Sequence, residues 1–259
     1  MASFPQMKYL PPVLDSTGWT WERYSAPSGV PSDNFWLGFD LEGNRWLTKL
    51  RGSFYAYREI VFSHLAQKMG WSCQSSSFLR LNNESAKVLG VSTDEVHAAH
   101  WFMDEHIHAP CSPECSLEFM NGRSVETVDD LRDSEIDHLL DWPKSEFAAF
   151  LFGANELPGR LFTTAHEFVI IDSEQMFSTD PCSLDGAAWW KNPDGHLSLS
   201  GQALALEVCH DLCALSTEDL DDALSIPITI SVRKRWLIEP KLKASRKFAT
   251  QFCASHARV

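Results

Sequence analysis

The sequence has no apolar run that reaches the roughly 18–20 residues a membrane-spanning helix needs. Its first residues also lack the basic start and the apolar stretch of a signal peptide. Seven cysteines are an odd number in a chain of 259 residues, which argues against a secreted disulfide framework. We therefore expect a cytoplasmic protein with reduced thiols and no membrane partner.

Basic residues are scarce. The chain has 22 Lys and Arg against 35 Asp and Glu, so its formal net charge is -13. An acidic surface disfavours binding to a phosphate backbone, and we expect no direct contact with nucleic acid. A local basic pocket for a small phosphate ligand remains compatible with this charge. The densest basic stretch is predicted to be a solvated helix face or a partner site, and it comprises Arg233, Lys234, Arg235, Lys241, Lys243, Arg246 and Lys247.

Internal repeats and low-complexity linkers are absent as well. The length suffices for one large domain or two lobes, and a hydrophobic content of 44% is that of a globular protein. Strand-like patterns with one long helix fill the first hundred residues, and helical patterns dominate afterwards. This order predicts an α+β fold with two lobes, a β-rich N-lobe over 1–105 and a helical C-lobe over 106–259. The segment "WFMDE", 101–105, is the predicted hinge beside a cleft.

Local patterns give the main elements. The stretch "NFWLGFDLEGNRWLTKL", 34–50, predicts a β-hairpin turning at Gly43, with Trp36 and Trp46 paired across it. Apolar spacing predicts a helix over 53–70, and shorter apolar runs predict strands at 76–81, 97–105 and 166–172. Further helices are expected at 125–140, 143–153, 198–215, 216–225 and 232–254, with a capping box between Ser216 and Asp219.

Lys49 is the first candidate for chemistry. It ends the second strand of the predicted hairpin, and an inward-facing ammonium is costly to bury without a partner. Glu59 follows in the first turns of the next helix. A strand Lys held by a Glu from the following helix is the arrangement by which kinases grip nucleotide phosphates. The alternative is a Lys at a strand end that reaches water.

Two further stretches bear on phosphate binding. The loop "SAPSGVPSDNF", 25–35, contains the small residues Ser28, Gly29 and Ser32, which let backbone N–H groups approach phosphate oxygens, or it is an ordinary surface turn. The strand "EFVIID" ends at Asp172, and Glu174 follows two residues later. Such acids can hold Mg²⁺ against a polyphosphate, or Asp172 caps the next turn.

In this order and spacing, "RWLTKL", "YREIVFSHLAQKMGW" and "NELPGRLF…FVIIDSEQMF" resemble the HipA-like kinase family. This family is a branch of the protein-kinase-like fold related to phosphatidylinositol kinases, and the resemblance covers roughly residues 20–180. It implies that Lys49 is the ATP lysine, Glu59 its helix partner and Asp172 the Mg²⁺ ligand. It also implies ATP-dependent transfer of phosphate to a protein Ser or Thr. Family members often belong to toxin–antitoxin or defence operons, which makes the product of a neighbouring gene the expected partner.

The catalytic loop departs from the family pattern. With Asp172 in register, the catalytic Asp position falls on Asn155 and the metal-binding Asn position on Arg160. An amide cannot accept the substrate proton as a carboxylate does. In one reading Glu156 supplies the carboxylate and Arg160 replaces a cation. In the other reading the chain is a pseudokinase, a regulatory module that binds a nucleotide or a protein and transfers nothing.

A metal site is also expected in "DEHIHAPCSPEC", 104–115. Its His106, His108, Cys111 and Cys115 have the ligand types of a tetrahedral zinc shell. The alternative is a polar loop between the lobes with surface histidines and two half-buried thiols.

Overall fold

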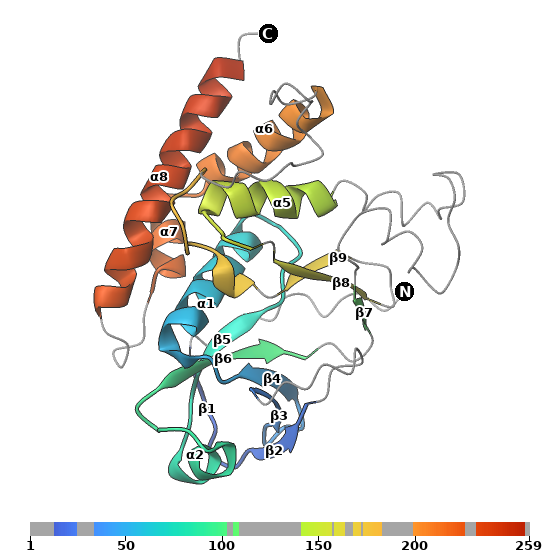
Figure 1. Cartoon of the computed structure of the whole chain (residues 1–259), viewed down its shortest axis with the longest axis vertical. Helices are drawn as coiled ribbons and strands as arrows, with labels where there is room; N and C mark the ends of the chain where they lie inside the picture. Colours follow the sequence, from blue (N-terminus) through green and yellow to red (C-terminus); the bar gives the residue numbers. More distant parts are fainter. Residues whose placement is uncertain are drawn as a thin grey trace.

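The computed structural model describes residues 13–24, 34–102, 106–108, 141–156, 158–163, 168–171, 173–182, 199–225 and 232–256. The N-terminal part is a six-stranded sheet with the order β1-β5-β6-β4-β3-β2, shown in the lower half of Figure 1. Its strands are β1 (Val13–Asp15), β2 (Thr20–Arg23), β3 (Phe35–Phe39), β4 (Arg45–Lys49), β5 (Ser76–Arg80) and β6 (Val96–Trp101). The short helix α2 (Asn83–Leu89) connects β5 to β6.

The predicted hairpin is confirmed as β3 and β4, which pair antiparallel from Phe35 opposite Lys49 to Phe39 opposite Arg45. Gly43 takes a φ of +80° in its turn, which is a conformation that favours glycine. The carboxylate of Asp40 accepts hydrogen bonds from the backbone of Asn44 and from the indole of Trp46. These contacts fix the register that carries Lys49 to the end of β4.

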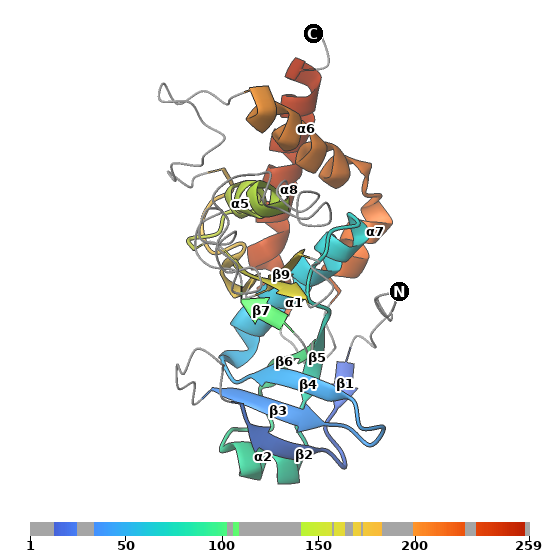
Figure 2. The same ribbon diagram turned by 90° about the vertical axis from the view of Figure 1, so that its right-hand side faces the viewer.

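Helix α1 (Gly52–Lys68) lies between the sheet and the helical part of the molecule, as Figures 1 and 2 show. It packs on β5 and β6 and is buried from Ala56 to Ser63. The hydroxyl of Tyr57 donates to the carbonyl of Leu224, and the ammonium of Lys68 lies 2.9 Å from a carboxylate oxygen of Asp219. The helix that carries Glu59 is therefore held from both sides.

The C-terminal part combines helices with a second, three-stranded sheet. The sheet has the order β7-β8-β9, from β7 (His106–His108), β8 (Gly159–Thr163) and β9 (Phe168–Ile171). Its helices are α5 (Asp141–Phe152), the one-turn η3 (Ser173–Gln175), α6 (Leu199–Ala214), α7 (Thr217–Ala223) and α8 (Val232–His256). The capping box of Ser216 and Asp219 is confirmed at the start of α7. None of the described helices is long and apolar enough to cross a membrane.

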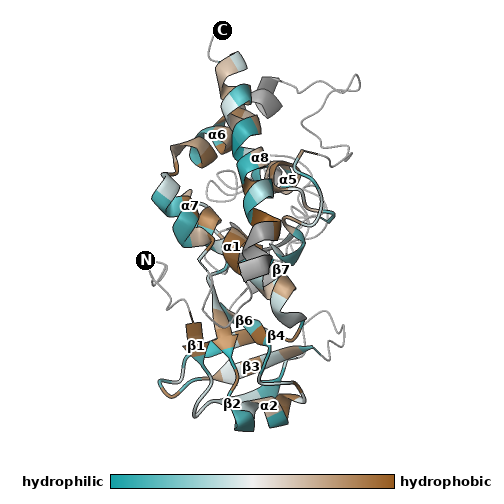
Figure 3. Cartoon of the chain, turned by 90° about the vertical axis from the view of Figure 1, so that its left-hand side faces the viewer, coloured by the Kyte–Doolittle hydropathy of each residue, from teal (hydrophilic) through white to brown (hydrophobic). Residues whose placement is uncertain are grey.

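The C-terminal helix presents a polar surface. Figure 3 shows many hydrophilic residues along the visible side of α8. Lys243 and Lys247 of this helix are exposed. Lys241 and Arg246 instead reach backbone carbonyls of other segments. These four residues of the basic stretch are thus divided between solvent and internal contacts.

The structure differs from the local predictions in three places. His106 and His108 lie in strand β7, where a loop was expected, and Arg160 lies in strand β8, opposite Ile170. Trp36 stands opposite Thr48, so the predicted pair with Trp46 is wrong. Trp46 packs instead against Trp101, which stands directly opposite it on the adjacent strand β6, and against Trp19, which precedes β2. The helix expected at 125–140 lies outside the described residues.

Buried His97 on β6 makes stability dependent on pH. Its side chain is 1% exposed, and neither ring nitrogen has a hydrogen-bond partner among the residues described. Burial disfavours the charged ring and lowers the pKa of His97 below its ordinary value of 6.5. The unfolded chain thus binds a proton at a higher pH than the folded chain does. Stability is full above pH 6.5 and is lost as the pH falls below that value.

We expect the free energy of unfolding in urea to decrease between pH 7 and pH 5, and His97→Leu to reduce that decrease. Staying above pH 5 keeps the contribution of Glu59 nearly constant, because a carboxyl with a lowered pKa loses its stabilising effect only as the pH falls below its ordinary pKa of 4.5. The control is His210→Leu, since His210 is exposed on α6 and its replacement should preserve the slope. Equal slopes for the two variants would contradict the assignment to His97.

Candidate active site

Lys49 and Glu59 form a buried ion pair between the sheet and α1. The ammonium of Lys49, 4% exposed, donates to Oε1 of Glu59 at 2.6 Å, and Glu59 is 3% exposed. Lys49 ends β4, and Glu59 lies in the second turn of α1, ten positions later. The short connection between β4 and α1 thus brings together the two residues that the sequence pattern had paired.

A histidine lies beside the second oxygen of Glu59. Nε2 of His100 on β6 lies 3.3 Å from Oε2 of Glu59, and Nδ1 of His100 lies 2.7 Å from the hydroxyl of Ser76. Burial acts to raise the pKa of Glu59, but the charges of His100 and Lys49 outweigh it and hold that pKa far below the ordinary 4.5. Glu59 is therefore a fixed carboxylate that can orient the ammonium of Lys49.

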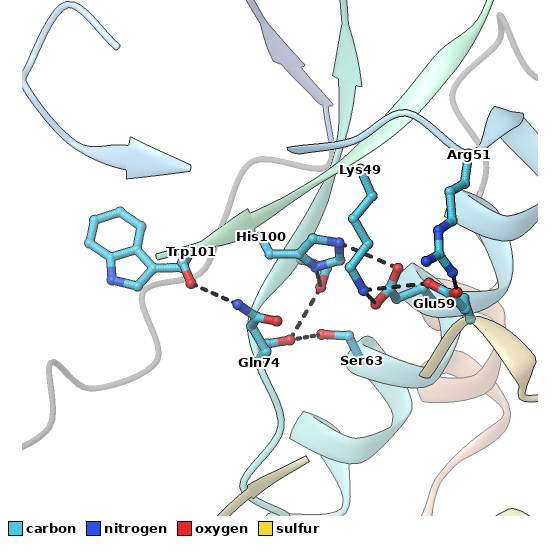
Figure 4. Close-up of polar contacts among 9 residues, drawn as sticks. Lys49, Arg51, Glu59, Ser63, Gln74, His100 and Trp101 are labelled. Carbon is cyan, nitrogen blue, oxygen red and sulfur yellow. Dashed lines mark hydrogen bonds and ion pairs between the residues drawn. The ribbon is translucent and has the colours of Figure 1, made fainter. Parts of the chain in front are cut away.

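Glu174 on η3 brings a second carboxylate to Lys49 from the C-terminal part. Its Oε2 lies 3.5 Å from the ammonium of Lys49, and its Oε1 forms an ion pair with Arg51. Glu174 is 5% exposed. Figure 4 shows Lys49, Arg51 and Glu59 converging on this point, together with His100 from β6. The network joins β4, α1, β6 and η3, so the ammonium of Lys49 sits where the sheet meets the C-terminal part.

The sheet face beside Lys49 carries an apolar wall. Side chains alternate along a strand, so Leu47 faces the same side as Lys49. Leu37 on β3 stands directly opposite Leu47. Both leucines are partly exposed, whereas Trp46 and Thr48 on the other face are buried. An apolar surface next to the ammonium of Lys49 suits a ligand that combines an aromatic base with a phosphate.

Two of the three predicted transfer residues, Asn155 and Glu156, follow the end of α5, and the third, Arg160, lies on β8. Asn155 and Glu156 are both exposed. The backbone N–H of Asn155 donates to Oγ of Ser178 at 2.9 Å, and the Ser178 hydroxyl lies 2.8 Å from Oδ1 of Asn155. The side chain of Asn155 is thus tied to the turn after η3, while the neighbouring carboxylate of Glu156 faces solvent.

Several predicted positions lie outside the described residues. These are Ser28, Gly29 and Ser32 of the loop before β3, Asp172 after β9, and Cys111 and Cys115 of the expected zinc site. The predicted zinc and Mg²⁺ sites therefore stay predictions. Among the residues described, no group of three or more His, Cys, Asp or Glu side chains is arranged to hold a metal ion.

Sequence reasoning missed Arg51, His100 and the wall of Leu37 and Leu47. The alternation of β4 was a usable signal for Leu47, since it lies two residues before Lys49. His100 carried no such signal, because its contact with Glu59 depends on β6 lying next to β4 in the sheet.

Comparisons with known proteins support the fold. No model of a protein family matches the sequence, and a search of curated proteins found no match. The structure is similar to the crystal structure of a Helicobacter pylori proinflammatory kinase, CtkA, with a TM-score of 0.60 and 10% sequence identity. The similarity covers 96% of this chain and 100% of that chain. The chain thus has a kinase-like α+β fold, with a sheet in the N-terminal region and helices in the C-terminal part.

Proposed function

We propose that this chain is an atypical kinase of the HipA-like type, which binds ATP and transfers phosphate to a Ser or Thr of a protein. The observation that carries the proposal is the buried pair of Lys49 and Glu59, at 2.6 Å, between a strand and the following helix. In kinases this pair must be in place for phosphoryl transfer. The same proposal assigns 1–105 to a nucleotide-binding lobe and 106–259 to a lobe that carries the transfer residues.

Lys49 would neutralise phosphate charge, and Glu59 would hold its ammonium toward the cleft. His100 lies 3.3 Å from the other oxygen of Glu59, and its charge lowers the pKa of this carboxyl and so keeps it ionised. The adenine would lie on the wall of Leu37 and Leu47. Phosphate oxygens would compete with Glu174 for Lys49, and Arg51 is placed to retain Glu174 when they do.

The described residues fit the nucleotide better than the metal. A buried lysine with one short carboxylate contact is suited to a phosphate anion. Glu174 has the oxygen ligands that Mg²⁺ prefers, but both of its oxygens face cations. Asp172 is therefore the residue that we propose holds Mg²⁺, which neutralises phosphate charge when bound.

A second function is favoured by the contacts of Glu174 and Asn155. Glu174 covers the ammonium that phosphates would need, and Asn155 replaces a catalytic carboxylate and is bound to Ser178. These features are those of a pseudokinase that binds a nucleotide or a protein without transfer. Its partner would be another protein, encoded by a neighbouring gene.

The experiment that separates the two functions is incubation of the purified chain with ATP and Mg²⁺, followed by measurement of phosphate on a general protein substrate and on the chain itself. Transfer that is absent in Asp172→Ala supports the kinase. Binding of ATP without transfer supports the pseudokinase. Full transfer by Asp172→Ala would contradict the proposed Mg²⁺ ligand.

If the chain transfers phosphate, Glu156→Gln should reduce kcat by about 10²–10⁴-fold, the usual contribution of a general base. The exposed Glu156 is the carboxylate nearest in sequence to the position where the family has its catalytic Asp. Glu42→Gln is the control, because Glu42 is an exposed carboxylate in the β3–β4 turn. Equal kcat values for the two variants, measured with saturating ATP, would exclude Glu156 as the base.

A further inference from the structure

Arg58 on α1 is a buried cation without an anionic partner. Its side chain is 5% exposed, and it makes no hydrogen bond or ion pair with any residue that the structure describes. Its Nε is fully buried and has no acceptor. An arginine carries five N–H donors in a planar fork, and donors left unsatisfied in the interior are costly. The buried Nε–H of Arg58 therefore lacks an acceptor.

Two aromatic rings support Arg58 without satisfying its donors. The guanidinium carbon lies 4.7 Å from the ring centre of Phe54 and 4.8 Å from that of Tyr55. Contacts of this kind use the flat faces of the guanidinium, whereas its N–H groups point outward in the plane. The rings hold the fork in place, and its edge remains available for an anion.

A second cation, Lys241, lies on α8, which packs against α1. The face of α1 that carries Arg58 continues one turn later to Phe62, which contacts Phe152, and Phe152 contacts Phe177. The carbonyl of Phe177 accepts a hydrogen bond from the ammonium of Lys241 at 2.9 Å. α1 and α8 are also in direct contact. α1 and α8 are thus packed together, and the charge of Arg58 acts on the ammonium of Lys241.

Lys241 has donor capacity left for a ligand. Two of its three N–H groups donate to the carbonyls of Phe177 and Thr179, at 2.9 and 3.0 Å. Burial lowers the pKa of Lys241, Asp180 opposes this, and the charge of Arg58 lowers that pKa further. The like charges of Arg58 and Lys241 repel each other, and Asp180 acts against this effect at Lys241.

We propose that Arg58 and Lys241 form a binding site for a phosphate-type oxyanion, between α1, the turn at 177–180 and α8. The fork of Arg58 binds two oxygens, and the third N–H of Lys241 binds another. A phosphate dianion carries enough negative charge to neutralise both cations, although the carboxylate of Asp180 also acts on Lys241. Because α1 carries Glu59, the anion fastens the helix of the Lys49 pair to α8. The site does not depend on whether the chain transfers phosphate.

The first test is thermal unfolding of the full chain with inorganic phosphate, with sodium chloride holding the ionic strength constant. Phosphate should raise the Tm of the wild type by about 4 °C when it is well above its Kd. Arg58→Gln should lose this shift. Arg80→Gln, at an exposed arginine on β5, should keep it, and any small shift that remains in Arg58→Gln is the general stabilisation by phosphate salts.

Equal shifts in the wild type and in Arg58→Gln would overturn the proposal. If Arg58→Gln does not fold, calorimetric titration of the wild type and of Arg58→Lys with phosphate tests the site instead. One site per chain that is weakened at least tenfold in Arg58→Lys supports the fork contact, since lysine keeps the charge but loses the geometry. No heat of binding in the wild type contradicts the site.

The oxyanion could be free phosphate or a phosphoryl group on a side chain. Phosphatase treatment of the purified chain, followed by intact mass and thermal unfolding, distinguishes them. A loss of mass with a lower Tm in the wild type, but not in Arg58→Gln, identifies a phosphorylated side chain as the source. An unchanged mass with a retained response to added phosphate identifies the free anion.

Discussion

Replacing Lys49 by methionine should destabilise the fold by about 3–5 kcal/mol and abolish stabilisation by ATP. Methionine has a similar length but no charge, so Glu59 and Glu174 lose a cation that both of them contact. Removal of one partner from a buried ion pair leaves an uncompensated charge in the interior, which accounts for this magnitude. Urea unfolding measures the free-energy change, and thermal unfolding with and without ATP measures the loss of binding.

The matched control is Lys144→Met. Lys144 and Glu207 lie at the same 2.6 Å distance as Lys49 and Glu59, but the Glu207 side chain is 52% exposed. Exposed pairs contribute about 0–1 kcal/mol, so this variant should remain close to the wild type and keep its response to ATP. A similar destabilisation in both variants would mean that burial is not what makes the Lys49 pair strong.

The double variant Lys49→Met with Glu59→Gln separates stability from binding. Neutralising Glu59 removes one of the uncompensated charges, so part of the lost stability should return. ATP binding should not return, because the ammonium that meets the phosphates is still absent. Recovery of ATP binding along with stability would show that Lys49 acts only through the fold.

Gly153→Ala should destabilise the chain by about 2–4 kcal/mol, from a strained backbone and from a steric overlap. Gly153 has a φ of +67°, and a Cβ placed there would lie 2.5 Å from the carbonyl oxygen of Thr179. That oxygen also accepts a hydrogen bond from Lys241, and the N–H of Thr179 donates to the carbonyl of Gly153. The turn that follows η3 must therefore move away from α5, which is measured as a lower free energy of unfolding in urea.

The control for this prediction is Gly70→Ala. Gly70 has a φ of +76°, but a Cβ there would meet nothing within 4 Å. This variant should be destabilised only by the left-handed backbone conformation of the new alanine, which costs about 1–2 kcal/mol. If Gly153→Ala were no more destabilising than Gly70→Ala, the close approach of the turn to Gly153 would be contradicted.

Sequence patterns predicted the helices and strands well where the apolar residues followed one clear spacing, that of a helix or that of a strand. The β3–β4 hairpin, α1 and the last helix were found because their apolar residues repeat with a clear period and end at Gly or at a polar turn. Strands β7 and β8 were missed. They have three and five residues, and β8 contains Arg160 in a segment interpreted as a loop. Such short strands depend on their pairing in the sheet, of β7 with β8 and of β8 with β9, which no local pattern reveals.

The pairing of Trp46 shows the same limit for side chains. Its partners Trp19 and Trp101 are far from it in sequence, and only the order of strands in the sheet brings the three rings together. The candidate active site likewise contains one contact between residues close in sequence and one between residues far apart in sequence. Lys49 and Glu59 are ten residues apart and could be paired from the sequence. Glu174 is 125 residues from Lys49, so its contact required the complete fold.

The central claim, that Lys49 faces the phosphates of a bound nucleotide, can be tested by chemical labelling. An acyl-phosphate derivative of ATP carries its reactive carbonyl beside the phosphates, where a lysine amine attacks it, becomes acylated and releases the nucleotide. Mass spectrometry of the digested protein should find the acyl group on Lys49, and excess ATP should prevent the labelling, while exposed lysines such as Lys247 react equally with and without ATP. Failure of Lys49 to react, or labelling of Lys49 that ATP does not reduce, would contradict a nucleotide site at this ion pair.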